Sequence, residues 1–243
     1  MDAEECQREM PKKEVYMKIT WIGQAGLLLD NGKTKIMIDP YLSDCVEKVH
    51  ASNYRRVPIK EALFDIEPDV MIFTHDHLDH YDPETAPRFL TKQSKQMTVL
   101  CPSSVWQKAR RHGGGHNYVE FNRHTEWTER GFRFSAVWAA HSDPFAIGVI
   151  IEDLTDGRKY YITGDTLYNS EIFADLPKDI DLVFLPINGV GNNMNEVDAV
   201  RFFKKSGARA AVPYHVGMFD EKSPELFDAD NRVILEIYKE TEM

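Results

Sequence analysis

The segment from residue 74 to residue 80 constrains this chain more than any other, because it concentrates side chains that bind metal ions. It reads Thr-His-Asp-His-Leu-Asp-His and follows a short apolar run, residues 69–73, that is typical of a buried strand. For a single histidine, a solvated polar loop would be the simpler interpretation. Imidazoles and carboxylates held this close together incur desolvation and repulsion costs that a cation offsets. We therefore expect a metal site, with these ligand candidates: His75, His77, Asp79 and His80.

Three later segments repeat this pattern of an apolar run followed by a histidine or an aspartate. His141 follows the expected strand 132–139, Asp165 follows 159–163, and His215 follows 208–212. Ligand sites collect beyond the ends of strands in layered α/β folds. We expect the fold to bring these three side chains to the 74–80 segment.

Short strand-like runs alternate with helical ones, and no linker rich in Pro, Gly or Ser divides the 243 residues. This pattern predicts one α/β domain over residues 16–243, preceded by a polar extension at 1–15. The Asp30-Asn31-Gly32 sequence between apolar runs predicts a hairpin. Helices are expected over 167–174, 195–206 and 224–239; Asn195 is a capping candidate for the second, and Gly207 a glycine that stops it. Residues 41–66 are expected to form a long irregular loop.

Charge and cysteine content narrow the range of partners. A net charge of −10 makes nucleic acid an improbable partner, because binding to phosphate backbones depends on clustered Lys and Arg. No apolar run reaches the roughly 20 residues of a membrane helix. Three cysteines without a CxxC pair (Cys6, Cys45 and Cys101) fit a reducing cytoplasm. We expect a cytoplasmic protein with a small-molecule substrate and no membrane contact; homo-oligomerisation stays open.

On its motifs the chain resembles the metal-dependent hydrolases of the metallo-β-lactamase fold. The HxHxDH pattern at residues 75–80 carries the resemblance, together with Gly164-Asp165-Thr166 and the isolated His141 and His215. Ile38-Asp39-Pro40-Tyr41 is similar to the first motif of that superfamily. The resemblance implies an α/β fold, a four-layer αββα sandwich of two mixed β-sheets flanked by helices.

The same resemblance implies a two-metal site at one edge of the sheets. In that pattern His75, His77 and His141 hold one ion, and Asp165 bridges it to a second. The second ion is held by Asp79, His80 and His215. Imidazole and carboxylate ligands suit zinc first, with manganese or iron as alternatives.

Within the superfamily, the chain is most similar to the ascorbate-6-phosphate lactonase-like group. The similar segments are HDHLDHYD at 75–82, GDTLY at 164–168, GVGNNMNEVDAVRF at 189–202 and VPYHVGMF at 212–219. Asn192-Asn193-Met194 stands where that group has an Asp-Lys-Met type segment. The departure leaves the particular lactone open.

A hydroxide held between two divalent ions would attack a carbonyl or phosphoryl centre. It forms near neutral pH because metal binding lowers the pKa of a bound water to roughly 7. Asp79 and Asp165 are the catalytic candidates, since either carboxylate can hold the proton of that hydroxide. Asp39 and Asp76 are candidates for hydrogen bonds that orient the ligand histidines. The plainer interpretation of each aspartate is a turn residue.

Five further residues are candidates for substrate contact. Tyr168, Asn188 and Asn193 lie in segments expected to flank the metals, although turn-forming asparagines and a packed tyrosine would explain them as well. Arg55 and Arg56 could clamp a phosphate or carboxylate; an exposed solubilising pair is the alternative.

The leading hypothesis is a metal-dependent hydrolase of a small polar or anionic substrate, such as a lactone or a phosphorylated sugar derivative. One alternative is a phosphodiesterase or nuclease acting on a small nucleotide or RNA. Another is a non-catalytic metal-bound sensing or scaffold module, against which the complete set of ligand candidates argues.

Overall fold

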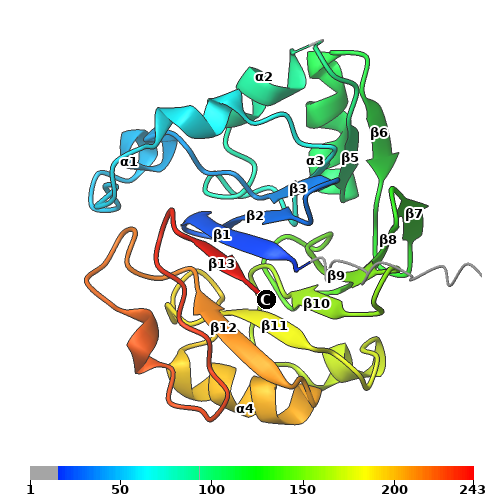
Figure 1. The fold of residues 1–243 in the computed structure, drawn as a ribbon. Helices are drawn as coiled ribbons and strands as arrows, with labels where there is room; N and C mark the ends of the chain where they lie inside the picture. Colours follow the sequence, from blue (N-terminus) through cyan, green and yellow to red (C-terminus); the bar gives the residue numbers. More distant parts are fainter. Residues whose placement is uncertain (1–15, 93) are drawn as a thin grey trace, which may run out of the picture.

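The chain forms two β-sheets that pack face to face, with helices outside each sheet (Figure 1). The computed structural model describes residues 16–92 and 94–243. The prediction of two mixed sheets flanked by helices is confirmed. The predicted polar extension, residues 1–15, lies outside the described residues.

The first sheet combines an antiparallel part with a parallel one. Its strands, in the order in which they pair, are β13 (Glu240–Glu242), β1 (Lys18–Gly23), β2 (Gly26–Asp30), β3 (Lys35–Ile38), β4 (Val70–Ile72), β5 (Thr98–Cys101) and β6 (Asn117–Glu120). Pairing is antiparallel from β13 to β3 and parallel from β3 to β6. The predicted hairpin joins β2 to β3, where the side chain of Asn31 accepts a hydrogen bond from the backbone N–H of Thr34 at 2.9 Å.

The second sheet has the same mixed character. Its strands, in pairing order, are β12 (Ala210–Tyr214), β11 (Leu182–Pro186), β10 (Lys159–Ile162), β9 (Ile147–Asp153), β8 (Phe132–Trp138) and β7 (Glu126–Glu129). β10, β11 and β12 are parallel, and the remaining pairs are antiparallel. All five residues of β11 are buried, which is typical of a parallel strand that is covered on both faces.

Helices cover the outer faces of both sheets. α1 (Cys45–Val49), α2 (Thr85–Leu90) and α3 (Ser103–Ala109) lie on the side of the first sheet, and α4 (Glu196–Ser206) lies on the side of the second (Figure 1). α4 begins at Asn195, whose side chain accepts a hydrogen bond from the N–H of Asp198 at 2.8 Å. It ends at Gly207, which has a left-handed φ of 71° that glycine adopts without strain.

The prediction of a helix over 224–239 is wrong. Only a 3₁₀ turn, η4 (Pro224–Leu226), forms there, and the segment then runs extended beside two strands. The N–H of Val233 donates to the carbonyl of Ala211 at 2.8 Å, and Ile237 forms a bridge to Trp21. Val233, Leu235 and Ile237 recur at every second position, a period that fits an extended segment rather than a helix.

Two further expectations need correction. The expected irregular loop 41–66 contains α1 and the 3₁₀ turn η1 (Glu61–Asp65). The expected helix at 167–174 is a shorter 3₁₀ turn, η3 (Ser170–Ala174).

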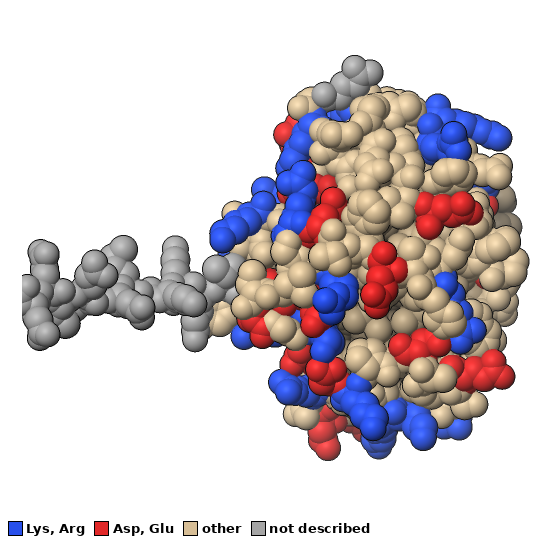
Figure 2. All heavy atoms as spheres, turned by 90° about the vertical axis from the view of Figure 1, so that its right-hand side faces the viewer, with Lys and Arg blue, Asp and Glu red and all other residues tan. Residues whose placement is uncertain are grey.

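Both basic and acidic side chains lie on the side of the molecule that carries the edge strands β6 and β7. Figure 2, which faces this side, shows basic and acidic side chains interspersed rather than one basic patch. Arg133 pairs with Glu152 at 3.0 Å, and Arg130 pairs with Asp69 at 3.1 Å. Within residues 16–92 and 94–243, no helix has the length and apolar character needed to cross a membrane.

Candidate metal centre

The predicted ligands lie together beyond the ends of four strands. The loop after β4 supplies His75, His77, Asp79 and His80; His141, Asp165 and His215 follow β8, β10 and β12. They form two groups, within each of which one possible ligand atom per residue lies within 4.8 Å of the others. The first group is His75, His77, His141 and Asp165, and the second is Asp79, His80 and His215.

Facing imidazole nitrogens characterise the first group. Nδ1 of His77 lies 3.1 Å from Nε2 of His141, and the rings of His75 and His141 are 4.6 Å apart between centroids. Nε2 of His75 is buried and has no hydrogen-bond partner among the described residues. Burial, with a further contribution from the neighbouring His80, lowers the pKa of His75 well below its usual value, so its ring is neutral. A neutral, buried imidazole with an unused nitrogen is a suitable metal ligand.

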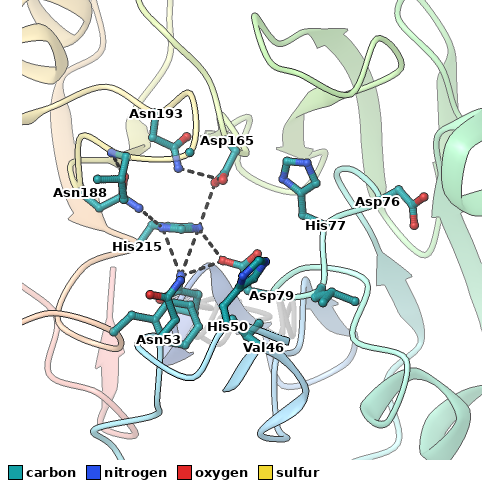
Figure 3. A pocket seen from close by; sticks show the side chains of 15 residues that line it. Val46, His50, Asn53, Asp76, His77, Asp79, Asp165, Asn188, Asn193 and His215 are labelled. Atoms are coloured by element: carbon teal, nitrogen blue, oxygen red, sulfur yellow. Dashed lines mark hydrogen bonds and ion pairs between the residues drawn. The ribbon is translucent and has the colours of Figure 1, made fainter. Parts of the chain in front are cut away.

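Carboxylates and imidazoles meet in the second group. Nε2 of His80 lies 3.1 Å from Nε2 of His215. Oδ2 of Asp79 lies 3.4 Å from the same atom of His215 (Figure 3). Burial alone would raise the pKa of Asp79, but His80 and His215 hold it below its usual value. Nearby carboxylates raise the pKa of both histidines against the effect of burial. The same negative charge would attract a divalent cation to these side chains.

Asp165 lies between the two groups. Its Oδ1 is 3.2 Å from Nε2 of His80 and 3.1 Å from Nε2 of His215. Its Oδ2 is 4.0 Å from Nε2 of His75. Although burial raises the pKa of Asp165, the adjacent His215 and His80 hold it well below the usual range, so the carboxylate is ionised. This donor set fits two divalent cations that share one carboxylate.

Asp39 orients the second group from behind. Its buried carboxylate accepts a hydrogen bond from Nδ1 of His80 at 2.8 Å, which turns the other ring nitrogen toward Asp165. It also accepts from the N–H of Thr74 at 2.8 Å and from its hydroxyl at 2.6 Å. A carboxylate behind a ligand histidine fixes the orientation of the ring and makes it a better donor.

Asp76 does not support the histidines as predicted. Its carboxylate points away from them (Figure 3) and forms an ion pair with Lys108 of α3. The N–H of Asp76 donates to Oδ2 of Asp143 at 3.1 Å, and the hydroxyl of Ser104 donates to the same atom at 2.6 Å. Asp143, two residues after His141, therefore ties the two histidine-bearing loops to α3.

Gln24 belongs to the site although the sequence reasoning did not select it. It lies in the tight turn between β1 and β2, and its Nε2 donates to Oδ2 of Asp79 at 2.8 Å. Its carbonyl accepts from the N–H of His215 at 3.2 Å. Gln24, Asp39 and His215 all have positive φ, at 48°, 42° and 57°. Such backbone strain concentrates at functional sites; in the sequence, the available signal is a polar residue between Gly23 and Gly26.

Asn188 and Asn193 contact two of the predicted ligands. The amide of Asn188 lies 3.0 Å from Nδ1 of His215, and Nδ2 of Asn193 donates to Oδ2 of Asp165 at 2.8 Å (Figure 3). Both asparagines also line the pocket described below.

The other three predicted substrate contacts have structural partners instead. The ring of Tyr168 packs on Phe173 and Phe202, with centroids 5.7 and 6.3 Å away. The side chain of Arg55 is 4% exposed, and its Nε donates to the carbonyl of Ser43 at 3.3 Å. Arg56 stacks on Tyr54 at 4.4 Å. All three side chains contact other parts of the protein, and none of them lines the pocket.

A pocket of about 440 Å³ opens over both groups. Its volume lies within the range of small-molecule sites, about 300–1,000 Å³. Asp79, Asp165 and His215 form part of its floor (Figure 3). His50 and Asn53, from the segment after β3, contribute to the wall.

Residues 34–216 match the family described as the beta-lactamase superfamily domain. A UPF0173 protein of Pyrococcus furiosus is 27% identical over 213 residues, which cover 87% of this chain and 89% of the relative. A UPF0173 metal-dependent hydrolase of Thermus thermophilus is 26% identical over 211 residues, covering 84% and 85%.

Similar structures agree with the sequence match. The metallo-β-lactamase fold protein YhfI from Bacillus subtilis superposes with a TM-score of 0.70 at 19% identity, over 95% of this chain and all (100%) of that one. The sandwich seen here is therefore the metallo-β-lactamase fold, and this chain belongs to the beta-lactamase superfamily domain family.

Proposed function

We propose that this protein is a metal-dependent hydrolase that cleaves a carboxylic ester or lactone in a small molecule. The observation that carries the proposal is the position of Asp165 between two His/Asp groups beneath an open pocket. The name of the Thermus thermophilus relative, a metal-dependent hydrolase, supports the same reaction class.

The proposed cofactors are two divalent ions, zinc in the first place, with manganese or iron as alternatives. His75, His77 and His141 would hold one ion and Asp79, His80 and His215 the other, with Asp165 between them. When bound, such ions polarise a carbonyl oxygen and lower the pKa of a water to roughly 7.

The chain's own carboxylates would orient the water in this reaction. The oxygen of water forms a bond to the acyl carbon, the acyl C–O bond breaks, and one proton of the water passes to the leaving oxygen. Asp79 is ionised and its side chain is 18% exposed at the pocket, so its carboxylate can accept a hydrogen bond from the attacking water and orient it. Gln24 holds Asp79 in place, and Asn193 holds Asp165. A lactone yields one hydroxy acid, and an ester yields an acid and an alcohol.

The alternatives have less support. A nuclease or phosphodiesterase needs cations that bind phosphates, and the described residues that line the pocket include neither a lysine nor an arginine. A sensing module would not require Asp79 and Asp165 to line a pocket of substrate size. We propose a cytoplasmic location because Cys45 and Cys101 are buried free thiols.

Metal analysis combined with a substrate panel tests the proposal. Protein purified without chelator should contain about two equivalents of metal, and it should hydrolyse γ-lactones or p-nitrophenyl esters faster than bis(p-nitrophenyl) phosphate. EDTA should abolish the activity, and zinc or manganese should restore it. His77→Ala should lose activity, while His112→Gln, which changes a histidine outside both groups, should keep it. Less than one equivalent, with no hydrolysis after metal addition, would refute the hydrolase; faster cleavage of the phosphodiester would favour the phosphodiesterase.

A further inference from the structure

We infer that the substrate carries an uncharged, apolar group, and that this group lies on a wall formed by Val46, Leu78 and Phe219. The inference rests on the proposed hydrolase function and narrows its substrate class. All three side chains line the pocket over the metal groups. The group attached to the reacting ester or lactone would contact this wall while its carbonyl lies over Asp165.

The wall is the exposed side of a separate hydrophobic cluster. Val46 packs with Tyr41, Cys45 and Met218, and Leu78 and Phe219 pack against this cluster. The rings of Tyr41 and Phe219 meet edge to face, with centroids 5.6 Å apart and planes at 71°. Phe219 is therefore held in place before any ligand binds, which reduces the entropy cost of binding an apolar group.

Arg55 packs against this cluster and does not line the pocket. Its guanidinium lies 4.6 Å from the centre of the Tyr41 ring, and its Nη1 lies 3.3 Å from Sδ of Met218. Another of its nitrogens donates to the carbonyl of Tyr41. The guanidinium of Arg55, which the sequence suggested as a clamp for an anion, is thus directed into the protein, where it packs on apolar side chains.

The pocket offers no cationic side chain to a second anionic group on the substrate. Of the residues in the described ranges 16–92 and 94–243, those that line it include neither a lysine nor an arginine. Lys222 lines an adjoining hollow that shares Val190 and Phe219 with the pocket, but its Nζ already donates to the carbonyl of Asn188 at 2.7 Å. A phosphate or carboxylate remote from the metals would lose water without gaining a counter-charge. This argues against the phosphorylated sugar derivative that the sequence left open.

Val190, at the rim of the pocket, adds to the apolar surface formed by the wall. Val190 lines the pocket and is 63% exposed. Val197 is also 63% exposed but lies on α4 and does not line the pocket. The two valines offer a matched pair of sites at which to introduce a charge.

Two pairs of probes that differ only in a terminal carboxylate test the inference. Calorimetry on the zinc-loaded protein would compare hexanoate with adipate, and kinetics would compare p-nitrophenyl hexanoate with the p-nitrophenyl half-ester of adipate. We expect at least tenfold tighter binding of hexanoate and at least a tenfold higher kcat/KM for its ester. Shortening the acyl chain should lower kcat/KM by about fourfold per methylene, the value for burying one such group. Equal or better use of the adipate probes would overturn the inference.

Single-residue variants test where in the pocket the preference for hexanoate over adipate arises. Val190→Lys should shift the preference toward adipate by fivefold or more, whereas Val197→Lys should leave it unchanged. Phe219→Ala should flatten the dependence on chain length, and because Val190 is exposed, its variant tests the idea even if Phe219→Ala fails to fold. Identical behaviour of the two lysine variants would overturn the inference. If hexanoate is preferred over adipate but no ester or lactone is hydrolysed, the apolar site stands and the hydrolase proposal fails.

Discussion

The two halves of the candidate metal centre are built differently. In the inner group, Asp79, His80 and His215, each side chain has a polar partner behind it: Gln24, Asp39 and Asn188, at 2.8, 2.8 and 3.0 Å. In the outer group, His75, His77 and His141, the corresponding contacts are to hydroxyl and carbonyl oxygens at 3.0, 3.4 and 3.3 Å. His80 and His215 are buried, as is His75 of the outer group, whereas His77 and His141 are half-buried.

The difference shows how burial and orientation depend on each other. His80 and His215 each have partners at both ring nitrogens, so contacts within the protein orient the inner group. The half-buried outer histidines depend on the positions of two loops, which Asp143 ties to α3. We expect the inner group to bind metal more tightly than the outer one.

The largest expected effect comes from removing the carboxylate that the two halves share. Asp165→Ala should lower the metal content from about two equivalents to fewer than one, because Asp165 faces His75 as well as His80 and His215. Elemental analysis of protein purified without chelator measures this. Retention of both ions in the variant would show that the two halves are independent.

Asp39→Asn should affect the inner group selectively. Asparagine tolerates the left-handed φ of 42° at this position but removes the charge behind His80. The affinity of the inner group should fall by about 10–100-fold, the usual effect of removing a hydrogen-bond partner of a ligand. A chelator competition titration would resolve it. Asp76→Asn is the matched control, since that carboxylate pairs with Lys108; equal losses in both variants would contradict the assignment.

Asp143→Ala should affect the outer group, and by less. Asp143 acts through the backbone of Asp76 and through Ser104 rather than on a ligand side chain. A loss of about tenfold or less is therefore expected, at the low end of the range for such partners. The same titration would detect it, and a loss confined to the inner group would invalidate the division into two halves.

Asp175→Asn should leave metal binding unchanged and lower stability. This carboxylate lies outside the metal centre and accepts hydrogen bonds from Nε of Arg123 at 2.7 Å and from the N–H of Trp138 at 3.2 Å. Charged hydrogen bonds of this kind contribute about 1.5–3 kcal/mol, so urea unfolding should show a loss of that order. A metal content that fell in this variant would mean that the centre responds to stability in general.

The pH dependence gives a second readout for Asp175. The hydrogen bond from Arg123 is the main reason that the pKa of Asp175 is lowered to about 2. Its stabilising effect should be fully present above its ordinary pKa, 3.8, and should fade as pH falls toward 2. Wild type and Asp175→Asn should therefore differ at pH 6 and converge near pH 2. A constant difference would contradict the role of its charge.

Local patterns in the sequence predicted the features that depend on neighbours along the chain. The hairpin at Asn31 follows from turn chemistry, and the cap of α4 follows from Asn195 and Gly207. The candidate ligands stood out because histidines and aspartates came directly after apolar strands. The extended segment at 233–237 was misread as a helix because its partners, β12 and β1, are distant in the sequence.

Tertiary structure alone decided what the remaining polar side chains do. Gln24 and Asp79 are 55 positions apart, and no local pattern shows that their side chains meet at 2.8 Å. Arg55 looked like a ligand clamp until the fold directed it at Tyr41 and Met218, which lies 163 positions away. The sequence by itself determined which groups could bind metal, because ligand chemistry belongs to each side chain. Which groups orient the ligands, and which shape the pocket, depends on long-range packing, because a side chain's role is set by what surrounds it.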